Sequence, residues 1–66
     1  MDRTPGTDFP NQIKQLRARL GLTQVMLAER LGVSFPTVNR WENQKSIPSQ
    51  LAWNKLLEMA GEQDAG

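Results

Sequence analysis

The stretch that decides the fold runs from Leu22 to Asn43 and reads LTQVMLAERLGVSFPTVNRWEN. Thr23 is a favourable N-cap, and the apolar residues that follow it recur at spacings that place them on one helix face. Gly32 suits the left-handed backbone that ends a helix, and Ser34 suits the N-cap of a second helix. The stretch therefore predicts two short helices joined by a tight turn. The apolar residues on the face of the first helix are Leu27, Ala28 and Leu31.

The second of these helices, predicted over about residues 35–43, has an apolar and a polar side. Val38 and Trp41 lie three residues apart and are expected to face inward. A short helix that is held by one side and presents polar groups on the other suits the major groove of DNA. The pattern is that of a helix-turn-helix, which makes double-stranded DNA the expected partner. The residues left on or near the solvent side are Phe35, Pro36, Thr37, Asn39 and Arg40.

Apolar stripes outside this stretch predict two further helices. The first starts at Asp8 or Phe9 and runs through to Gly21. The second is capped by Ser49 and ends at Gly61. The expected inward residues are Phe9, Ile13, Leu16 and Leu20 in the first helix, and Leu51 or Ala52, Trp53, Leu56, Leu57 and Ala60 in the second.

The sequence contains no strand pattern and no internal repeat, so it predicts an all-α fold. We expect a compact bundle of four to five short helices that contains the helix-turn-helix. Residues 1–8 are expected to be a disordered lead-in, residues 9–61 the folded domain, and residues 62–66 a flexible acidic tail. Because helices this short are marginal alone, each depends on a shared core. The expected core consists of Leu16, Leu20, Leu27, Ala28, Leu31, Val38, Trp41 and Leu56.

The composition narrows the functional classes. The chain has 66 residues with 38% hydrophobic and 23% charged residues, which is typical of one small globular domain. It has no cysteine, no histidine and no Gly-rich phosphate loop, so the common nucleophile–base pairs and transition-metal sites cannot be assembled. We therefore expect no enzyme activity, no cofactor and no bound metal. No apolar run approaches the roughly 20 residues that span a bilayer, and no signal peptide is apparent, which favours a cytoplasmic protein without membrane contact.

The charge is unevenly distributed along the chain, although the net charge is only +1. Between Pro10 and Ile47 six cationic residues stand against two acidic residues, whereas both ends are net acidic. This regional excess favours a nucleic-acid partner, but the charged surface of any small helical protein produces a similar pattern. The cationic residues are Lys14, Arg17, Arg19, Arg30, Arg40 and Lys45, and the acidic residues are Glu29 and Glu42.

Several segments, in the same order and spacing, resemble the lambda-type repressor and Cro group of helix-turn-helix domains, also called the xenobiotic-response-element type. The resemblance implies a sequence-specific DNA-binding protein, a transcriptional regulator of the repressor type that occupies an operator. It leaves open whether the protein binds a palindromic operator as a homodimer or acts with an unidentified protein partner. The matching segments, spread over about residues 12–60, are Leu16-Arg17, Gly21-Leu22-Thr23-Gln24, Leu27-Ala28, Leu31-Gly32-Val33-Ser34, Thr37-Val38, Arg40-Trp41-Glu42-Asn43, Lys45 and Pro48-Ser49.

The resemblance also implies DNA contacts for individual residues. The implied base-reading residues are Phe35, Pro36, Thr37 and Arg40. The implied phosphate contacts come from Gln24, Ser34, Asn39, Asn43 and Lys45. Arg40 can present its guanidinium fork to guanine O6 and N7, and the alternative is that it meets phosphate alone. For Gln24 the alternative is an exposed side chain without a role, and for Ser34 capping is a sufficient explanation.

Arg17 and Glu42 resemble a pair that the family uses inside the fold to tie the first helix to the end of the third. Phosphate would repel Glu42, so this residue is a poor candidate for DNA contact. We therefore expect a structural ion pair. The alternative is that both side chains are solvated.

Three features depart from the family pattern. Phe35 and Pro36 stand where many relatives carry polar side chains, so contact with a thymine methyl is the expected substitute, unless Phe35 folds back over the turn. Gln44 replaces a common glycine, so either it takes the left-handed conformation or the turn is rearranged. Val25 and Met26 replace a charged pair. Together with the acidic tail, such apolar residues favour an alternative function, an antitoxin-like or accessory module that binds a protein partner and for which DNA contact is secondary.

Overall fold

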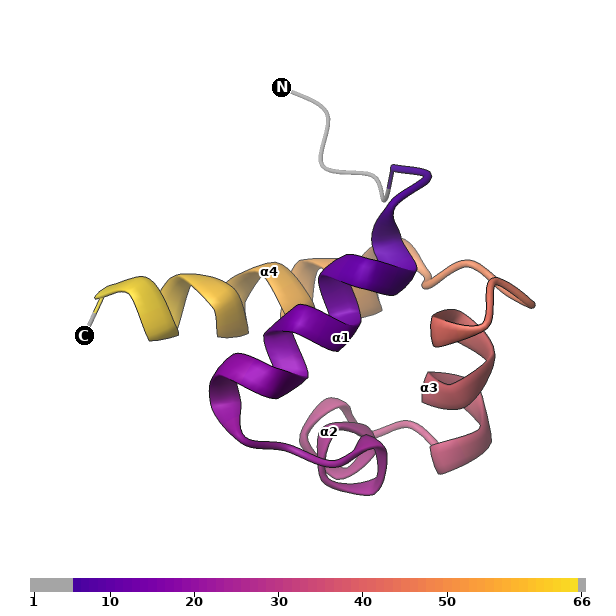
Figure 1. Cartoon of the computed structure of the whole chain (residues 1–66), viewed down its shortest axis with the longest axis horizontal. Helices are drawn as coiled ribbons and strands as arrows, with labels where there is room; N and C mark the ends of the chain where they lie inside the picture. Colours follow the sequence, from indigo (N-terminus) through magenta and orange to yellow (C-terminus); the bar gives the residue numbers. More distant parts are fainter. Residues whose placement is uncertain (1–5, 66) are drawn as a thin grey trace.

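Four helices make up the described part of the chain (Figure 1). The computed structural model describes residues 6–65, with side chains described as far as Gly61. No strand occurs within residues 6–65, so the fold is all-α, as the sequence predicts. The helices are α1 (Phe9–Leu20), α2 (Gln24–Leu31), α3 (Phe35–Glu42) and α4 (Gln50–Ala65).

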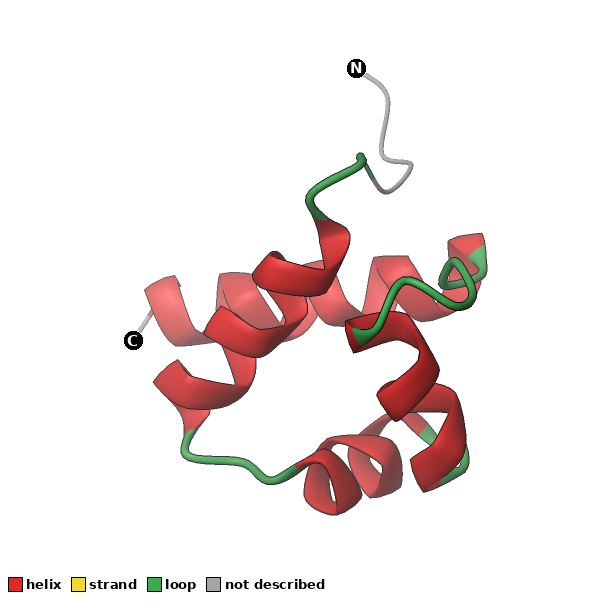
Figure 2. Ribbon diagram, turned by 45° about the vertical axis from the view of Figure 1, so that its right-hand side comes forward, coloured by secondary structure: helices red, strands yellow, loops and turns green. Residues whose placement is uncertain are grey.

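Hydroxyl side chains start three of the helices at the predicted residues. Thr23 Oγ1 accepts a hydrogen bond from the backbone N–H of Met26 at 3.1 Å at the start of α2. Ser34 caps α3 through the N–H of Thr37, and Ser49 precedes α4 and accepts from the N–H of Ala52 at 3.2 Å. These bonds satisfy N–H groups that have no partner within the helix. The connections α1–α2 and α2–α3 are short (Figure 2).

Left-handed residues end the first three helices. Gly21 closes α1 with φ of 69° and Gly32 closes α2 with φ of 74°. Gln44 follows α3 and has φ of 59°. Its N–H donates to the Trp41 carbonyl at 3.2 Å, while the N–H of Lys45 donates to the Arg40 carbonyl at 2.8 Å. This is the hydrogen-bond pattern of a glycine-ended helix, so the first of the two alternatives for Gln44 is realised.

The predicted end of α4 at Gly61 is wrong. The helix continues to Ala65, and Gly61 is not among the residues with positive φ. A glycine within a helix costs about 1 kcal/mol relative to alanine, which a helix already packed on the core tolerates. The backbone of residues 62–65 is therefore part of α4. The side chains of this acidic segment, Gly66 and most of the predicted lead-in (residues 1–5) lie outside the described residues.

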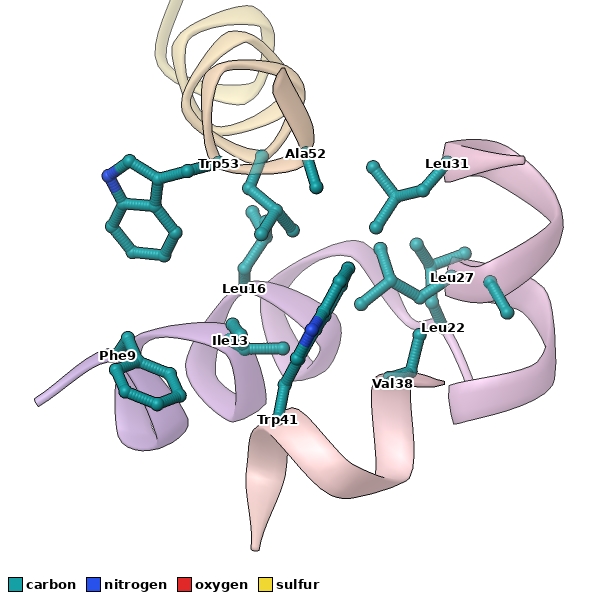
Figure 3. Packing of buried hydrophobic residues seen from close by; sticks show 12 residues of the cluster. Phe9, Ile13, Leu16, Leu22, Leu27, Leu31, Val38, Trp41, Ala52 and Trp53 are labelled. Atoms are coloured by element: carbon teal, nitrogen blue, oxygen red, sulfur yellow. The ribbon is translucent and has the colours of Figure 1, made fainter. Parts of the chain in front are cut away.

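The core forms where the four helices converge (Figure 3). The core residues expected from the sequence are buried, except that Leu20 is only partly buried. Of the two candidates at the start of α4, Ala52 is buried and Leu51 is 69% exposed. Leu22 was not expected in the core because it lies outside any helical stripe. It follows a left-handed glycine, a place where an apolar residue often packs back on its helix. The buried apolar residues are Phe9, Ile13, Leu16, Leu22, Leu27, Ala28, Leu31, Val38, Trp41, Ala52, Trp53 and Leu56.

We predict that Gln44→Gly stabilises the protein by about 1 kcal/mol, because glycine relieves the steric cost of the left-handed backbone. For a domain of this size such a gain raises the melting temperature by about 4–8 °C. Thermal and urea unfolding measure the change. Lys55→Gly is the matched control: it places glycine at an exposed position within α4 and is expected to lower stability by about 1 kcal/mol. A loss of stability in Gln44→Gly equal to that of the control would contradict the prediction.

Candidate nucleic-acid interface

Helices α2 and α3 form the predicted helix-turn-helix. Val38 and Trp41 of α3 are buried, at 0% and 3% exposure, and they fix the inner side of this helix. The outer side carries Phe35, Pro36 and Arg40, all of which are exposed. A helix anchored in this way presents one constant surface outward.

The predicted base-reading residues differ in what they offer to a base. Phe35 is 45% exposed and does not belong to the apolar core cluster, so it does not fold back as a buried cover. The Thr37 hydroxyl lies 2.8 Å from the Ser34 hydroxyl, and the two share a hydrogen bond. Arg40 is exposed in the last turn of α3. Together these residues form a surface with two apolar rings and one guanidinium group.

Three of the predicted phosphate-binding residues are hydrogen-bonded in a chain. The amide of Asn43 donates to Asn39 Oδ1 at 3.3 Å, and also to the Asn39 carbonyl at 2.8 Å. The amide of Asn39 in turn donates to Gln24 Oε1 at 3.2 Å. This chain links the outer side of α3 to the first residue of α2. The other two residues lie at the ends of α3: Ser34 is its N-cap, and Lys45 is exposed in the loop that follows it.

The hydrogen-bond chain continues into a partly buried ion pair. Gln24 Nε2 donates to Glu42 Oε1 at 3.0 Å. Arg17 donates to both oxygens of the same carboxylate, from Nε at 2.6 Å and from Nη2 at 2.8 Å. Its remaining terminal nitrogen, Nη1, donates to the Leu22 carbonyl at 3.2 Å. The two residues that the resemblance pairs are therefore in bidentate contact, and they tie α1 to the end of α3.

The ion pair shifts the titration of both members. Burial by itself raises the pKa of the Glu42 carboxyl, but the hydrogen bonds from Arg17 and Gln24, with the charges of Arg17 and Lys14, outweigh it. The pKa of Glu42 is therefore held below its ordinary value of 4.5. The hydrogen bond to Glu42 and the negative charge of that residue raise the pKa of Arg17, against the effect of its own partial burial. Both groups are charged at neutral pH.

Sequence analysis missed that Gln24 and Asn39 belong to this network. Each lies on a different helix, and Glu42 shares α3 with Asn39 only. Helical periodicity places residues on a face of their own helix, and it carries no information on which polar side chains meet across helices. No signal in this single sequence identified these contacts.

Within the described residues, no group of three or more Asp, Glu, His or Cys side chains is placed to hold a metal ion. In the same part of the chain, no helix combines the length and apolar character that crossing a membrane requires.

We predict that Arg17→Met destabilises the protein more than Glu42→Leu does. The first change leaves the Glu42 carboxylate, whose side chain is 2% exposed, without its cation, at a cost of about 3–5 kcal/mol. The second leaves Arg17, whose side chain is 22% exposed and can turn toward water. The double variant is expected to be more stable than Arg17→Met alone. Urea unfolding of all four proteins gives the coupling energy. Lys55→Met on α4, combined with Glu42→Leu, is the control pair, and its two changes in the free energy of unfolding should add. If the changes caused by Arg17→Met and Glu42→Leu also simply add, the prediction is contradicted.

We predict that Glu42 contributes a pH-dependent part of the stability. Because its pKa is lowered in the folded state, its contribution is present above the ordinary value of 4.5 and is lost as the pH falls through the lower, folded-state value. Urea midpoints measured across this acidic range for the natural protein and for Glu42→Gln isolate the effect from that of other carboxyls. The difference in stability between the two proteins should shrink on acidification. A difference that is constant with pH would contradict the assignment.

Comparison with known proteins agrees with this geometry. Over 60 residues the chain is 40% identical to the type II methyltransferase M1.ScrFI of Lactococcus lactis subsp. cremoris. The matched region makes up 86% of this chain but 15% of the methyltransferase. Over 32 residues it is 53% identical to the propionyl-CoA carboxylase regulator of Cereibacter sphaeroides. This matched region makes up 48% of this chain and 7% of the regulator. No solved structure matches the chain significantly. The family model for helix-turn-helix domains matches residues 13–61, most of the chain. The chain therefore belongs to the helix-turn-helix family of the Cro/C1 type, a family of DNA-binding regulatory domains.

Proposed function

We propose that the protein is a sequence-specific DNA-binding transcriptional regulator of the repressor type, which inserts α3 into the major groove. One observation carries this proposal. The inner side of α3 is fixed by Val38, Trp41 and Glu42, all buried, while its outer side leaves Arg40 exposed next to a polar chain of amides. A recognition helix needs this combination, because bases are read only by side chains held at a constant angle.

Base reading is proposed for the outer residues of α3. Arg40 would donate two hydrogen bonds to guanine O6 and N7. Phe35, Pro36 and Thr37 would meet base edges at the opening of the helix, where the N-terminal residues of recognition helices lie. Repression would follow from occupation of an operator that the transcription machinery also needs.

Phosphate contacts are proposed for the residues that flank α3. Gln24 uses one amide hydrogen for Glu42, and its NH₂ group retains a second hydrogen that can be donated to phosphate. The N-terminus of α2 adds a favourable partial positive charge at this position. Ser34, Asn39, Asn43 and Lys45 would fix the register of the protein on the duplex, since phosphate contacts carry no sequence information directly.

The two relatives support a DNA-binding regulatory function in general terms. One is named as a regulator and the other as a methyltransferase, but the chain spans 7% and 15% of their lengths, respectively, so neither whole activity is transferred. We propose that this chain is not itself an enzyme, because its sequence has no cysteine and no histidine to build a nucleophile–base pair. A regulator of transcription would act in the cytoplasm, either as a homodimer on a palindromic operator or with a protein partner.

A second candidate function rests on two exposed apolar residues of α2. Val25 is 50% exposed and Met26 is 42% exposed, where a purely DNA-binding surface would carry polar groups. This favours an antitoxin-like or accessory module whose main partner is a protein. Titration of labelled random duplex at two salt concentrations separates the two functions, because affinity through phosphate contacts falls steeply with salt. Absence of binding at low salt would favour the accessory module and contradict the regulator.

We predict different losses for Arg40→Ala and Gln24→Ala. Arg40→Ala should remove about 1–3 kcal/mol of discrimination at one base position and leave non-specific binding nearly intact. Gln24→Ala should weaken binding to all sequences alike, because a phosphate contact carries no base information. Urea unfolding of the same variant measures the separate loss of its hydrogen bonds with Glu42 and Asn39. Competition against single-base variants of a selected duplex measures both effects. The control is Lys55→Ala, an exposed cation on α4, which tests for loss of charge alone. A uniform loss in Arg40→Ala would reassign that residue to phosphate.

A further inference from the structure

The opening of α3 carries two apolar rings where a DNA-binding helix usually presents hydrogen-bonding groups. Phe35 is the first residue of α3 and is 45% exposed. Pro36 follows it and is also exposed, and a proline has no backbone N–H to donate. This end of the helix therefore cannot donate a hydrogen bond from either side chain or from the Pro36 backbone.

The neighbouring hydroxyl is already engaged. Thr37 Oγ1 and Ser34 Oγ lie 2.8 Å apart, and Ser34 Oγ also accepts from the Thr37 N–H at 3.4 Å. The bond between the two hydroxyls uses one of their two protons, and the accepting hydroxyl keeps its own proton. In the first turn of α3, one hydroxyl proton of this pair is thus left to donate, whereas Phe35 and Pro36 offer apolar contact alone.

An exposed hydrogen-bonding group on the same side of α3 is Arg40. It follows Pro36 by four residues, a spacing that puts two side chains on one helix face, about one turn apart. The apolar opening and the guanidinium are thus neighbours on the outer surface. A single helix turn covers adjacent base pairs in the major groove, so the two features would meet neighbouring bases.

Resting on the proposed function, we propose that Phe35 and Pro36 read the C5-methyl group of a pyrimidine that neighbours the guanine held by Arg40. The C5-methyl is the apolar group that a pyrimidine displays in the major groove: thymine carries it and unmodified cytosine lacks it. 5-Methylcytosine presents the same methyl group at the same place. The ligand class is therefore a 5-methylpyrimidine beside guanine, from either thymine or methylated cytosine.

The fixed Pro36 ring and the fixed backbone of Phe35 favour this assignment. Pro36 has a fixed φ and no rotatable side chain, and Phe35 is held at the capped end of a helix whose inner side is buried. Little conformational entropy is lost when such a surface covers a methyl group. The other exposed large apolar side chains of the described residues lie outside the recognition helix: Val25 and Met26 on α2, Ile47 in the loop after α3, and Leu51 on α4.

The test compares duplexes that differ by one methyl group. A duplex selected from a random pool is prepared with thymine or uracil at each thymine in turn, and with cytosine or 5-methylcytosine at the same positions. At the contacted position we expect the methylated base of each pair to bind about fourfold more tightly, the effect of burying one methyl group. The Phe35→Ala variant should bind the two members of each pair equally. Leu51→Ala, which removes a 69% exposed apolar side chain from α4, is the control and should keep the preference.

The outcomes separate this inference from the proposed function. Preference within the thymine–uracil pair alone, or within the cytosine pair alone, supports the inference and identifies the source of the methyl group. Equal binding within both pairs at every position, by a protein that still selects a duplex, overturns the inference and leaves the proposed function standing. A preference that persists unchanged in Phe35→Ala also overturns it. Failure to select any duplex overturns both.

Discussion

The burial of one carboxylate constrains the rest of this structure. Glu42 ends α3 inside the fold, and a buried charge is tolerated only when it is paired and fully hydrogen-bonded. Arg17 from α1 supplies two of its hydrogen bonds and Gln24 from α2 supplies a third. The three helices therefore cannot move independently without exposing this charge to an unfavourable environment. The direction of α3, and with it the placement of Arg40, is set by this requirement together with the apolar core.

Much of the fold could be predicted because its determinants are local. Thr23, Ser34 and Ser49 act within one helical turn, and Gly21 and Gly32 end helices through their own backbone freedom. Gly61 shows the limit of that reasoning, because its effect depends on whether the helix around it is already held by tertiary contacts. The site was predicted less completely. Periodicity predicted the correct side of α3 for its residues. It could not predict the hydrogen bonds of Gln24 with Asn39 and Glu42, because these bonds join separate helices.

The eight residues of α3 contribute both to the stability of the fold and to the outer surface, from different sides of the helix. Val38, Trp41 and Glu42 face inward and contribute to stability. Asn39 lies between the two sides and is partly buried. Its side chain links the internal hydrogen-bond network to Asn43 at the end of the helix. The polar chain thus reaches the surface without leaving a buried polar side-chain atom unsatisfied among the described residues.

The exposure of Phe35, Pro36 and Arg40 has an evolutionary consequence. None of the three belongs to the buried core or to the hydrogen-bonded chain that holds α3, so mutation can replace them at little cost in stability. New binding preferences are then accessible by single substitutions on a scaffold that stays folded throughout. Asn39 is the exception on this surface, because its amide is committed to Gln24. Divergence among descendants of such a chain should therefore be greatest at the three outward residues and least at Asn39.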